Sequence, residues 1–139
     1  MPDPCTYDYA IVRVVPRVER GEFVNVGAIV SSDAAGYLAA RFAVDEARLL
    51  SLDPTLDLKT VQTALDAIAA ICAGGALAGA LGRLSLRERF HWLVAPRSTI
   101  IQTSAVHTGR CDDLESALDH LLGRMVRPLL PASPPPSPP

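Results

Sequence analysis

The sequence predicts a single α+β domain, an antiparallel sheet of about five strands with two main helices packed on one face. Three observations predict this class. In the first third of the chain, short segments rich in Val, Ile and Ala are separated by turn residues, and a long helical pattern follows them. A second helical pattern comes shortly before a proline-rich end. The 139 residues are enough to bury one hydrophobic core without disulfides.

The first three strands are expected at residues 8–15, 23–30 and 37–44. Turns at Gly21 and Gly36 join them, and turns this short favour an antiparallel meander. Regular alternation in the second strand would place four small apolar side chains on one face, those of Val24, Val26, Ala28 and Val30. Gly27 lies inside that strand, which indicates a bulge or the close approach of another backbone.

One short helix and two main helices are expected after the meander. The short helix occupies residues 45–52. Asp57 caps the first main helix, whose apolar residues recur at intervals of three and four and which ends at Gly74–Gly75. The second main helix begins at Asp112, with a glutamate three residues later as in a capping box, and ends before Pro128.

A late hairpin is expected between the two main helices, with strands at residues 86–95 and 99–105. Alternation in the first of these strands groups Trp92 with Phe90 and Val94 on an apolar face, so we expect Trp92 to be a core anchor. The other face and the partner strand would then form a polar strip that contains Arg87, Arg89, His91, Gln102 and Ser104.

This polar strip has two interpretations. Arginine and hydroxyl donors beside an imidazole favour contact with an anion or a phosphate group. The alternative is an exposed sheet face with ordinary solvated charge. Arg97 and Ser98 in the hairpin turn extend the strip, and so does His107 in a polar turn before the last helix. His107 is either a general base or a residue that shapes that turn.

A second concentration of polar residues is the loop at residues 17–22 with the strand that follows it. Arg17 and Arg20 flank Glu19, and Asn25 is an amide in an otherwise apolar strand. The loop is either a recognition loop carried by a rigid sheet or a local ion pair beside an asparagine that satisfies the bulge. The candidate ligand-binding residues of the whole chain are thus Arg17, Arg20, Asn25, Arg89, His91, Arg97, Ser98, Gln102 and His107.

Several kinds of site and location are disfavoured. Cys5, Cys72 and Cys111 lack the spacing of a disulfide framework or a zinc site, so a reducing cytoplasm is expected. No two histidines have the spacing of a helical metal pair, and neither a metal nor a cofactor is predicted. The net charge of −2 disfavours a surface built for nucleic acid, although it is compatible with a local basic patch. No apolar run approaches the roughly 20 residues of a membrane span, so no membrane association is expected.

The domain is expected to cover residues 1–130. Residues 131–139, with the sequence PASPPPSPP, are expected to form a disordered, proline-rich tail outside the fold.

Four runs of the sequence carry a family resemblance. They are YDYAIVRVVPRVERGEFVNVGAIV, DEARLLSLDP, ICAGG and, above all, ERFHWLVAPRSTIIQTSAVHTG. Through them the chain from about Tyr7 to Arg127 resembles the bacterial domain-of-unknown-function family catalogued as number 3037. The resemblance implies no catalytic residues, because the activity of the family is not established. Members are often encoded beside kinases that resemble the HipA persistence toxins, which implies a partner protein more than an enzyme.

The leading hypothesis is a small, non-catalytic cytoplasmic module that binds a protein partner, with a HipA-like kinase as the partner that the resemblance implies. It would regulate the kinase or supply a missing lobe. The alternative is a phosphate-ligand or nucleic-acid binding protein, or an enzyme, that uses the Arg, His and hydroxyl cluster of residues 87–108. An enzyme gathers its polar groups in one concave pocket, whereas a binding module shows an apolar patch rimmed with charge.

Overall fold

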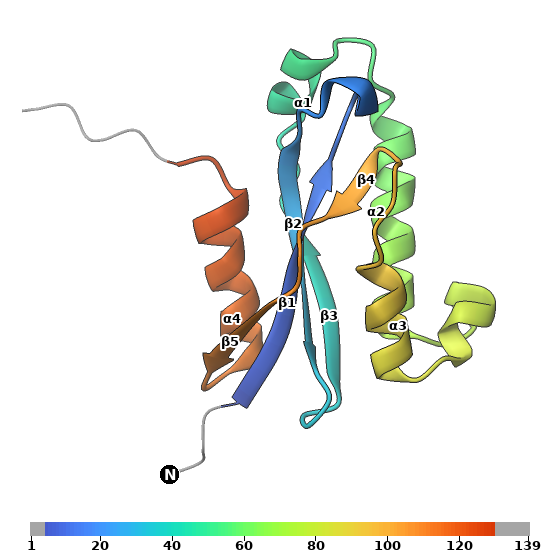
Figure 1. Ribbon diagram of the computed structural model, residues 1–139, viewed down its shortest axis with the longest axis vertical. Helices are drawn as coiled ribbons and strands as arrows, with labels where there is room; N and C mark the ends of the chain where they lie inside the picture. The colour runs from blue at the N-terminus through green and yellow to red at the C-terminus, as the bar shows by residue number, and fades with distance from the viewer. Residues whose placement is uncertain (1–4, 130–139) are drawn as a thin grey trace, which may run out of the picture.

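An antiparallel sheet of five strands forms the centre of the computed structural model, which describes residues 5–129 (Figure 1). β1 (Cys5–Val14), β2 (Val24–Ser32) and β3 (Tyr37–Phe42) are joined by short connections and lie in the order β3-β2-β1. The predicted α+β class and its three-strand meander are therefore confirmed. The tail predicted at residues 131–139 lies outside the described residues.

The two remaining strands lie one after the other along the free edge of β1. β4 (Ile101–Thr103) pairs with the half of β1 that ends at Val14, and β5 (His107–Cys111) pairs with the half that begins at Cys5. The two strands pair with β1 and not with each other. The late hairpin expected from the sequence is therefore wrong, although its second strand is real in part.

The residues expected as the first hairpin strand form a helix, α3 (Leu86–Leu93). Ser85 and Glu88 begin it with a capping box, in which each side chain accepts a hydrogen bond from the backbone N–H of the other, at 3.2 and 3.3 Å. Phe90 and Leu93, three residues apart, are buried, whereas Trp92 is 42% exposed. Trp92 is thus not a core anchor, because the apolar period of this segment is that of a helix.

β2 carries the irregularity predicted at Gly27. The pairing with β1 shifts there, so that Val26 has no partner in β1. A Cβ atom at Gly27 would lie 2.3 Å from the ring of Phe42 and 2.7 Å from the carbonyl oxygen of Arg41. Both features predicted for Gly27, a bulge and a close backbone approach, are therefore confirmed.

β2 presents apolar side chains to both faces of the sheet, and the bulge decides on which face those before Gly27 lie. Val24 and Val26 share a face with Ile29, whereas Ala28 and Val30 lie on the other face. The regular alternation expected for this strand is therefore wrong across Gly27. Two apolar faces require two layers of helix.

Helices cover both faces of the sheet (Figure 1). α1 (Glu46–Leu52), α2 (Leu58–Ala73) and α3 lie on one face. α4 (Leu114–Leu121), which continues into the π-helical turn η3 (Leu122–Val126), lies on the other. The two main helices, α2 and α4, are therefore on opposite faces and not on one face as expected.

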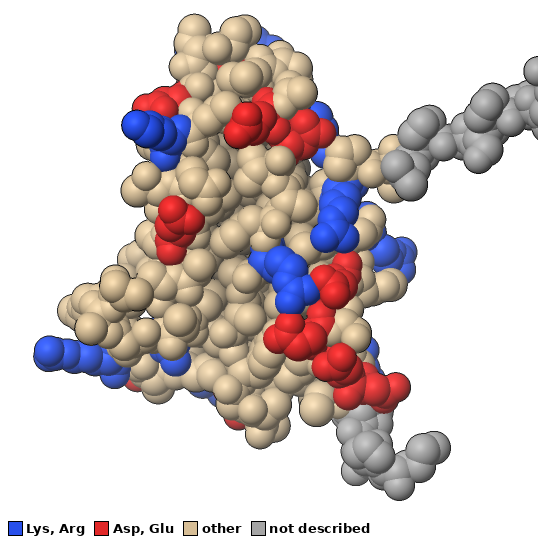
Figure 2. All heavy atoms as spheres, turned by 180° about the vertical axis from the view of Figure 1, so that it is seen from behind, with Lys and Arg blue, Asp and Glu red and all other residues tan. Residues whose placement is uncertain are grey.

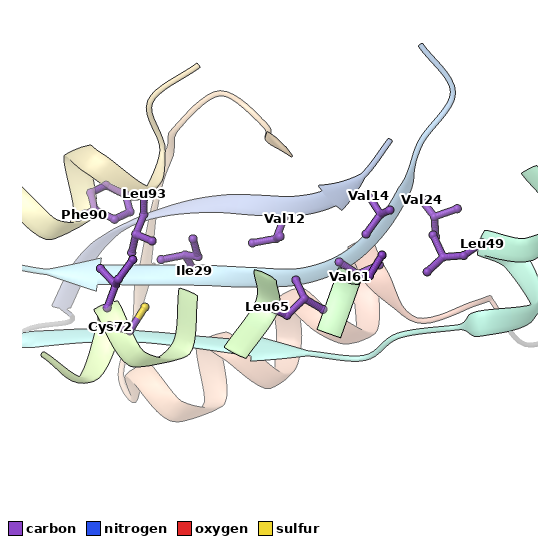
Figure 3. Packing of buried hydrophobic residues seen from close by; sticks show 12 residues of the cluster. Val12, Val14, Val24, Ile29, Leu49, Val61, Leu65, Cys72, Phe90 and Leu93 are labelled. Carbon is purple, nitrogen blue, oxygen red and sulfur yellow. The ribbon is translucent and has the colours of Figure 1, made fainter. Parts of the chain in front are cut away.

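Each face has its own buried core. Figure 3 shows the core beneath α2 and α3, which consists of Val12, Val14, Val24, Val26, Ile29, Leu49, Val61, Leu65, Ile71, Cys72, Phe90 and Leu93. The core beneath α4 consists of Tyr7, Ile11, Ala28, Val30, Ala117, Leu118, Leu121, Leu122 and Val126.

Most of the predicted helix boundaries are confirmed. Asp45 and Asp57 accept hydrogen bonds from backbone N–H groups in the first turns of α1 and α2, and α2 ends at Gly74. The last helix is capped by Asp113, one residue later than expected. Short 3-10 helices lie at Val18–Arg20 (η1) and Ala76–Arg83 (η2). No single helix within residues 5–129 is long and apolar enough to cross a membrane, although α2 and η2 together, with a 58° bend between them, reach that length and composition.

Candidate functional site

The fold divides the polar strip that was expected across residues 87–108. Arg89 and His91 lie on α3, whereas Gln102 lies on β4. Residues two apart on a helix point in directions about 200° apart, so the side chains of Arg89 and His91 do not share a face. The candidate residues of this segment therefore have to be followed one by one.

Arg89 closes the C-terminal end of α2. Its Nη1 atom donates to the carbonyl oxygens of Ile71 at 2.8 Å and Cys72 at 2.7 Å, and its Nε atom donates to the carbonyl oxygen of Leu84 at 3.2 Å. The first two carbonyls belong to the last turn of the helix, where no helical N–H group is available to them. Arg89 thus joins α2 to α3 through the N–H groups of Nε and Nη1.

Arg97 has the same role at the end of α3. Its two terminal nitrogens donate to the carbonyl oxygens of Trp92 at 2.6 Å and Leu93 at 3.1 Å. The guanidinium group also lies 4.1 Å from the centre of the Trp92 ring. The exposed indole and the arginine therefore stabilise each other at the end of a helix.

Three other candidates lie apart from these arginines. Gln102 donates from Nε2 to the carbonyl oxygen of Thr99 at 2.9 Å, and Ser98 is exposed in the loop before β4. His107 lies in β5, with its ring 5.5 Å from that of Tyr9 on β1. The polar turn expected at His107 is therefore wrong, because this segment is a strand.

The loop between β1 and β2 holds its arginines in ion pairs. Arg17 lies 3.4 Å from the carboxylate of Asp53, and Arg20 forms an ion pair with Glu22. Hydrogen bonds from the hydroxyl and N–H groups of Thr55, together with the charge of Arg17, hold the pKa of Asp53 below its usual value. These arginines attach the loop to itself and to the segment after α1.

Asn25, next to the bulge, binds the end of η3. Its Nδ2 atom donates to the carbonyl oxygen of Met125 at 2.9 Å, while its buried Oδ1 atom has no donor within residues 5–129. Arg13 is the partner of Asn25 across the sheet. The guanidinium of Arg13 lies 4.1 Å from the centre of the Phe23 ring, and its buried Nε atom has no acceptor among the described residues.

Asn25 and Arg13 lie beside a surface that the sequence analysis did not predict, which we name the arginine surface. Three exposed apolar side chains lie on it, with exposed fractions of 46% for Phe23, 39% for Met125 and 85% for Leu129. Around them are the arginines Arg13, Arg48, Arg124 and Arg127. Within the described part of the chain, none of these four arginines forms an ion pair with an acidic side chain.

The arginine surface is hollowed beside η3. A groove of about 400 Å³ runs between Arg48 and residues 124–129, and Arg48 donates to the carbonyl oxygen of Val126 at 3.5 Å. Charged side chains of both signs gather on the side of the molecule that carries α4, whereas much of the remaining surface in this view is uncharged (Figure 2). The signal in the sequence is the run GRMVRPL at the end of the last helix, where two arginines flank a methionine.

His91 lies in a second hollow, which we name the polar pocket. It has a volume of about 410 Å³ and lies between α3, the start of β1 and the end of β2. Arg87 and His91 come from the helix, and the remaining lining residues are Thr6, Tyr7, Asp8, Ser31, Ser32, Asp33, Ala34, Phe90 and Thr108.

Within the described residues, neither Cys72 nor Cys111 is activated as a nucleophile, and no metal site is formed. Burial raises the pKa of Cys72 to about 12, and burial together with the neighbouring Cys5 raises that of Cys111. A thiol with a raised pKa is a poor nucleophile at neutral pH. Within residues 5–129, no group of three or more His, Cys, Asp and Glu side chains is placed to hold a metal ion.

Residues 9–126 of the chain match a family model described as a protein of unknown function (DUF3037). The matched segment begins in β1 and ends with the last residue of η3, so it includes most of the sheet and all four α-helices. No curated protein and no solved structure matches the chain.

Proposed function

The chain belongs to the family of proteins of unknown function DUF3037, and we propose that it is a small, non-catalytic cytoplasmic module that binds a protein partner. The arginine surface carries this proposal. It combines exposed Phe23, Met125 and Leu129 with a rim of arginines. Phenylalanine, methionine and arginine are the side chains that are enriched at protein interfaces relative to other surfaces.

The charges on this surface favour an acidic segment of the partner. Arg124 and Arg127 are exposed and have no acidic partner within the described residues. A carboxylate in the groove beside η3 would accept two parallel hydrogen bonds from a guanidinium, the strongest arrangement available to this pair. An apolar residue beside that carboxylate would cover Met125 and Leu129.

The partner that we propose is a HipA-like kinase, which the module regulates or to which it supplies a missing lobe. The family resemblance supports this choice. The arginine surface supports a protein partner in general, because it lies at the junction of two strands, α1 and η3, where a rigid framework presents it.

The alternative, a phosphate or nucleic-acid site in residues 87–108, has less support. Arg89, Arg97 and Gln102 each donate to backbone carbonyl groups, so part of their donor capacity is used inside the domain. Arg87, His91 and Thr108 of that segment line the polar pocket. The remaining candidates, Arg89, Arg97 and Gln102, do not line it.

Isothermal titration calorimetry of the full chain against a HipA-like kinase from the same organism tests the proposal. The wild type should bind, with an affinity that weakens as salt is added. Reversal of two charges, with Arg124→Glu and Arg127→Glu together, should weaken binding by at least about tenfold. The double variant should stay folded, because both side chains are exposed.

The matched control is the double variant Lys59→Glu and Arg83→Glu. It changes the net charge by the same amount, at exposed positions on α2 and η2. The control should bind the kinase like the wild type. No binding by the wild type, or equal loss in both double variants, would contradict the proposal. Binding of a short DNA or RNA duplex that Arg124→Glu and Arg127→Glu abolish would instead assign the surface to nucleic acid.

A further inference from the structure

The polar pocket interrupts the sheet face that α2 and α3 cover. Alternation along β1 places Asp8 on the same face as the core residue Val12, and alternation along β2 places Ser31 on the face of Ile29. Asp8 and Ser31 are also direct partners across the two strands. A sheet face beneath a helix is normally apolar, whereas at this end of the face Asp8 is exposed to solvent and Ser31 beside it is buried.

The space above these side chains is open to a small molecule. The pocket of about 410 Å³ lies within the range of small-molecule sites in proteins. Ser31 is 5% exposed at its base, and its hydroxyl forms no side-chain hydrogen bond with another described residue. Phe90, which is 4% exposed, adds one apolar contact. A hydroxyl at the base of a pocket is well placed to bind a polar ligand.

The two walls of the polar pocket carry opposite charges. Arg87 and His91 are four residues apart on α3 and therefore lie on one side of the helix. Asp8 and Asp33 form the facing wall. Arg87 approaches Asp33 at 3.4 Å, but both side chains are more than half exposed, and such an ion pair is weak enough to exchange for a ligand.

Polar groups on both walls have hydrogen-bonding atoms without a partner among the described residues. Asp8 accepts a hydrogen bond from the hydroxyl of Thr108 at 2.9 Å through Oδ1, which leaves Oδ2 for a ligand. His91 is exposed and forms no hydrogen bond with another residue in the described range. A pocket with donors on one side and carboxylates on the other matches a ligand that carries both charges.

We propose that the polar pocket binds a small zwitterion of the amino-acid class. Its carboxylate lies between Arg87 and His91, and its ammonium group faces Asp8 and the hydroxyl of Ser31. An anion alone would be repelled by Asp8 and Asp33, and a cation alone would be repelled by Arg87. A zwitterion satisfies both walls with charge-assisted hydrogen bonds.

Nuclear magnetic resonance spectra of the full chain test this proposal. The amide shifts are recorded with each common amino acid in turn at millimolar concentration. At least one amino acid should bind and shift the amide signals of Ser31, Ser32 and Thr108. Acetate and methylamine, each of which carries only one of the two charges, should bind at least about tenfold more weakly.

Variants of the two walls test the placement of the ligand. Asp8→Asn and Arg87→Gln should each weaken binding by about tenfold. The matched controls Asp112→Asn and Arg83→Gln, at exposed positions outside the pocket, should not. If Asp8→Asn unfolds because its bond to Thr108 is lost, the exposed His91→Gln tests the opposite wall.

Three outcomes would overturn the proposal. They are the absence of binding by any amino acid, binding that none of the wall variants changes, and binding of acetate as strong as that of the best amino acid. The proposal is independent of the arginine surface, whose arginines do not line the polar pocket. The double variant with Arg124→Glu and Arg127→Glu should therefore bind the amino acid like the wild type.

Discussion

The two faces of the sheet use the same residue type in different ways. On the face of α2 and α3, Arg89 and Arg97 donate to backbone carbonyls at the ends of helices. On the face of α4, Arg41 forms ion pairs with Glu115 and Asp119 at the surface. Arg124 in η3 and Arg127 after it have no acidic partner among the described residues. The role of an arginine here is set by which acceptors lie near it.

The two faces also differ in the surface that their helices leave exposed. The face of α2 and α3 has the polar pocket at one end, where the helix does not fill the space above Asp8 and Ser31. The face of α4 has the arginine surface, which begins where η3 ends. One face therefore has a polar pocket beside α3, and the other has an exposed, arginine-rich surface beside η3.

The largest effects should come from the two cores. Leu65→Ala beneath α2 and Leu118→Ala beneath α4 should each lower the free energy of unfolding by about 2–5 kcal/mol, because both side chains are fully buried. Urea unfolding measures both. A cost below about 1 kcal/mol for Leu118→Ala alone would mean that α4 is only loosely attached, and the two faces would then not be equivalent layers of one fold.

The next largest effect should separate the two kinds of arginine. Arg89→Met removes donors from three carbonyl groups in a partly buried position, and it should cost about 2–3 kcal/mol. Arg41→Met removes surface ion pairs and should cost about 0.2–1 kcal/mol. Equal losses in urea unfolding would contradict the distinction between the two faces.

The first half of the fold could be predicted because its signals are local. Turn glycines, aspartate caps and the Gly74–Gly75 pair determine the boundaries of the meander and of α2 within a few residues of sequence. Residues 86–95 fit two patterns, because RERFHWL matches both the alternation of a strand and the three- and four-residue spacing of a helix. Ser85 followed by Glu88 distinguishes the two, because this capping box favours the helix.

The sequence predicts single members of the two candidate sites, Asn25 and His91, but not the sites as a whole, because each depends on contacts distant in sequence. Asn25 and Met125 meet across the arginine surface although a hundred residues separate them. Asp8 and Thr108 meet in the polar pocket in the same way. The bulge also determines on which face of the sheet Val26 lies relative to Ala28. The sequence indicates the bulge at Gly27, but it does not show which residue the bulge leaves unpaired.

A moderate effect is expected for Trp92 on α3. Its side chain is 42% exposed and its ring contacts the guanidinium of Arg97, so Trp92→Ala should cost about 1 kcal/mol. A buried tryptophan in a strand would cost about 3–5 kcal/mol. Urea unfolding distinguishes the two values, and the larger one would show that α3 contributes this side chain to the core.

A smaller effect should appear as a pH dependence of the α4 face. Hydrogen bonds from the hydroxyl of Ser116 and from the backbone N–H of Glu115 hold the pKa of Asp113 below its usual value of 3.8. A lowered pKa in the folded state stabilises the protein above the unfolded value, and this stabilisation is lost as the pH falls through the folded one. Asp113→Ala should therefore lower the melting temperature at neutral pH, and lower it by less near pH 3.

The control for this prediction is Asp112→Ala, one residue earlier, which does not cap the helix. It should leave the melting temperature nearly unchanged at both pH values. An equal loss at both pH values for Asp113→Ala would show that the capping carboxylate does not contribute through its charge.

The smallest effect on stability is expected from changes to the thiols, which differ in how deeply they are buried. Cys72 lies in the core beneath α2, where burial raises its pKa to about 12. Cys5 and Cys111 are partners across β1 and β5 and are only half-buried. Directly opposed residues of antiparallel strands have Cα atoms about 4.5–5.5 Å apart. A disulfide spans about 4.4–6.8 Å, so these two thiols are within reach of each other.

Incubation of the full chain with glutathione disulfide should therefore join Cys5 to Cys111. The two protein thiols are oxidised and lose their protons, the new S–S bond forms, and two molecules of glutathione leave. Mass spectrometry of the digest should show this cross-link with Cys72 as a free thiol. Cys111→Ser should prevent it and Cys72→Ser should not. If Cys72 in the folded protein reacts with a thiol reagent as fast as Cys111, the core beneath α2 and α3 is open to solvent near the end of α2, and Cys72 is not a protected core residue.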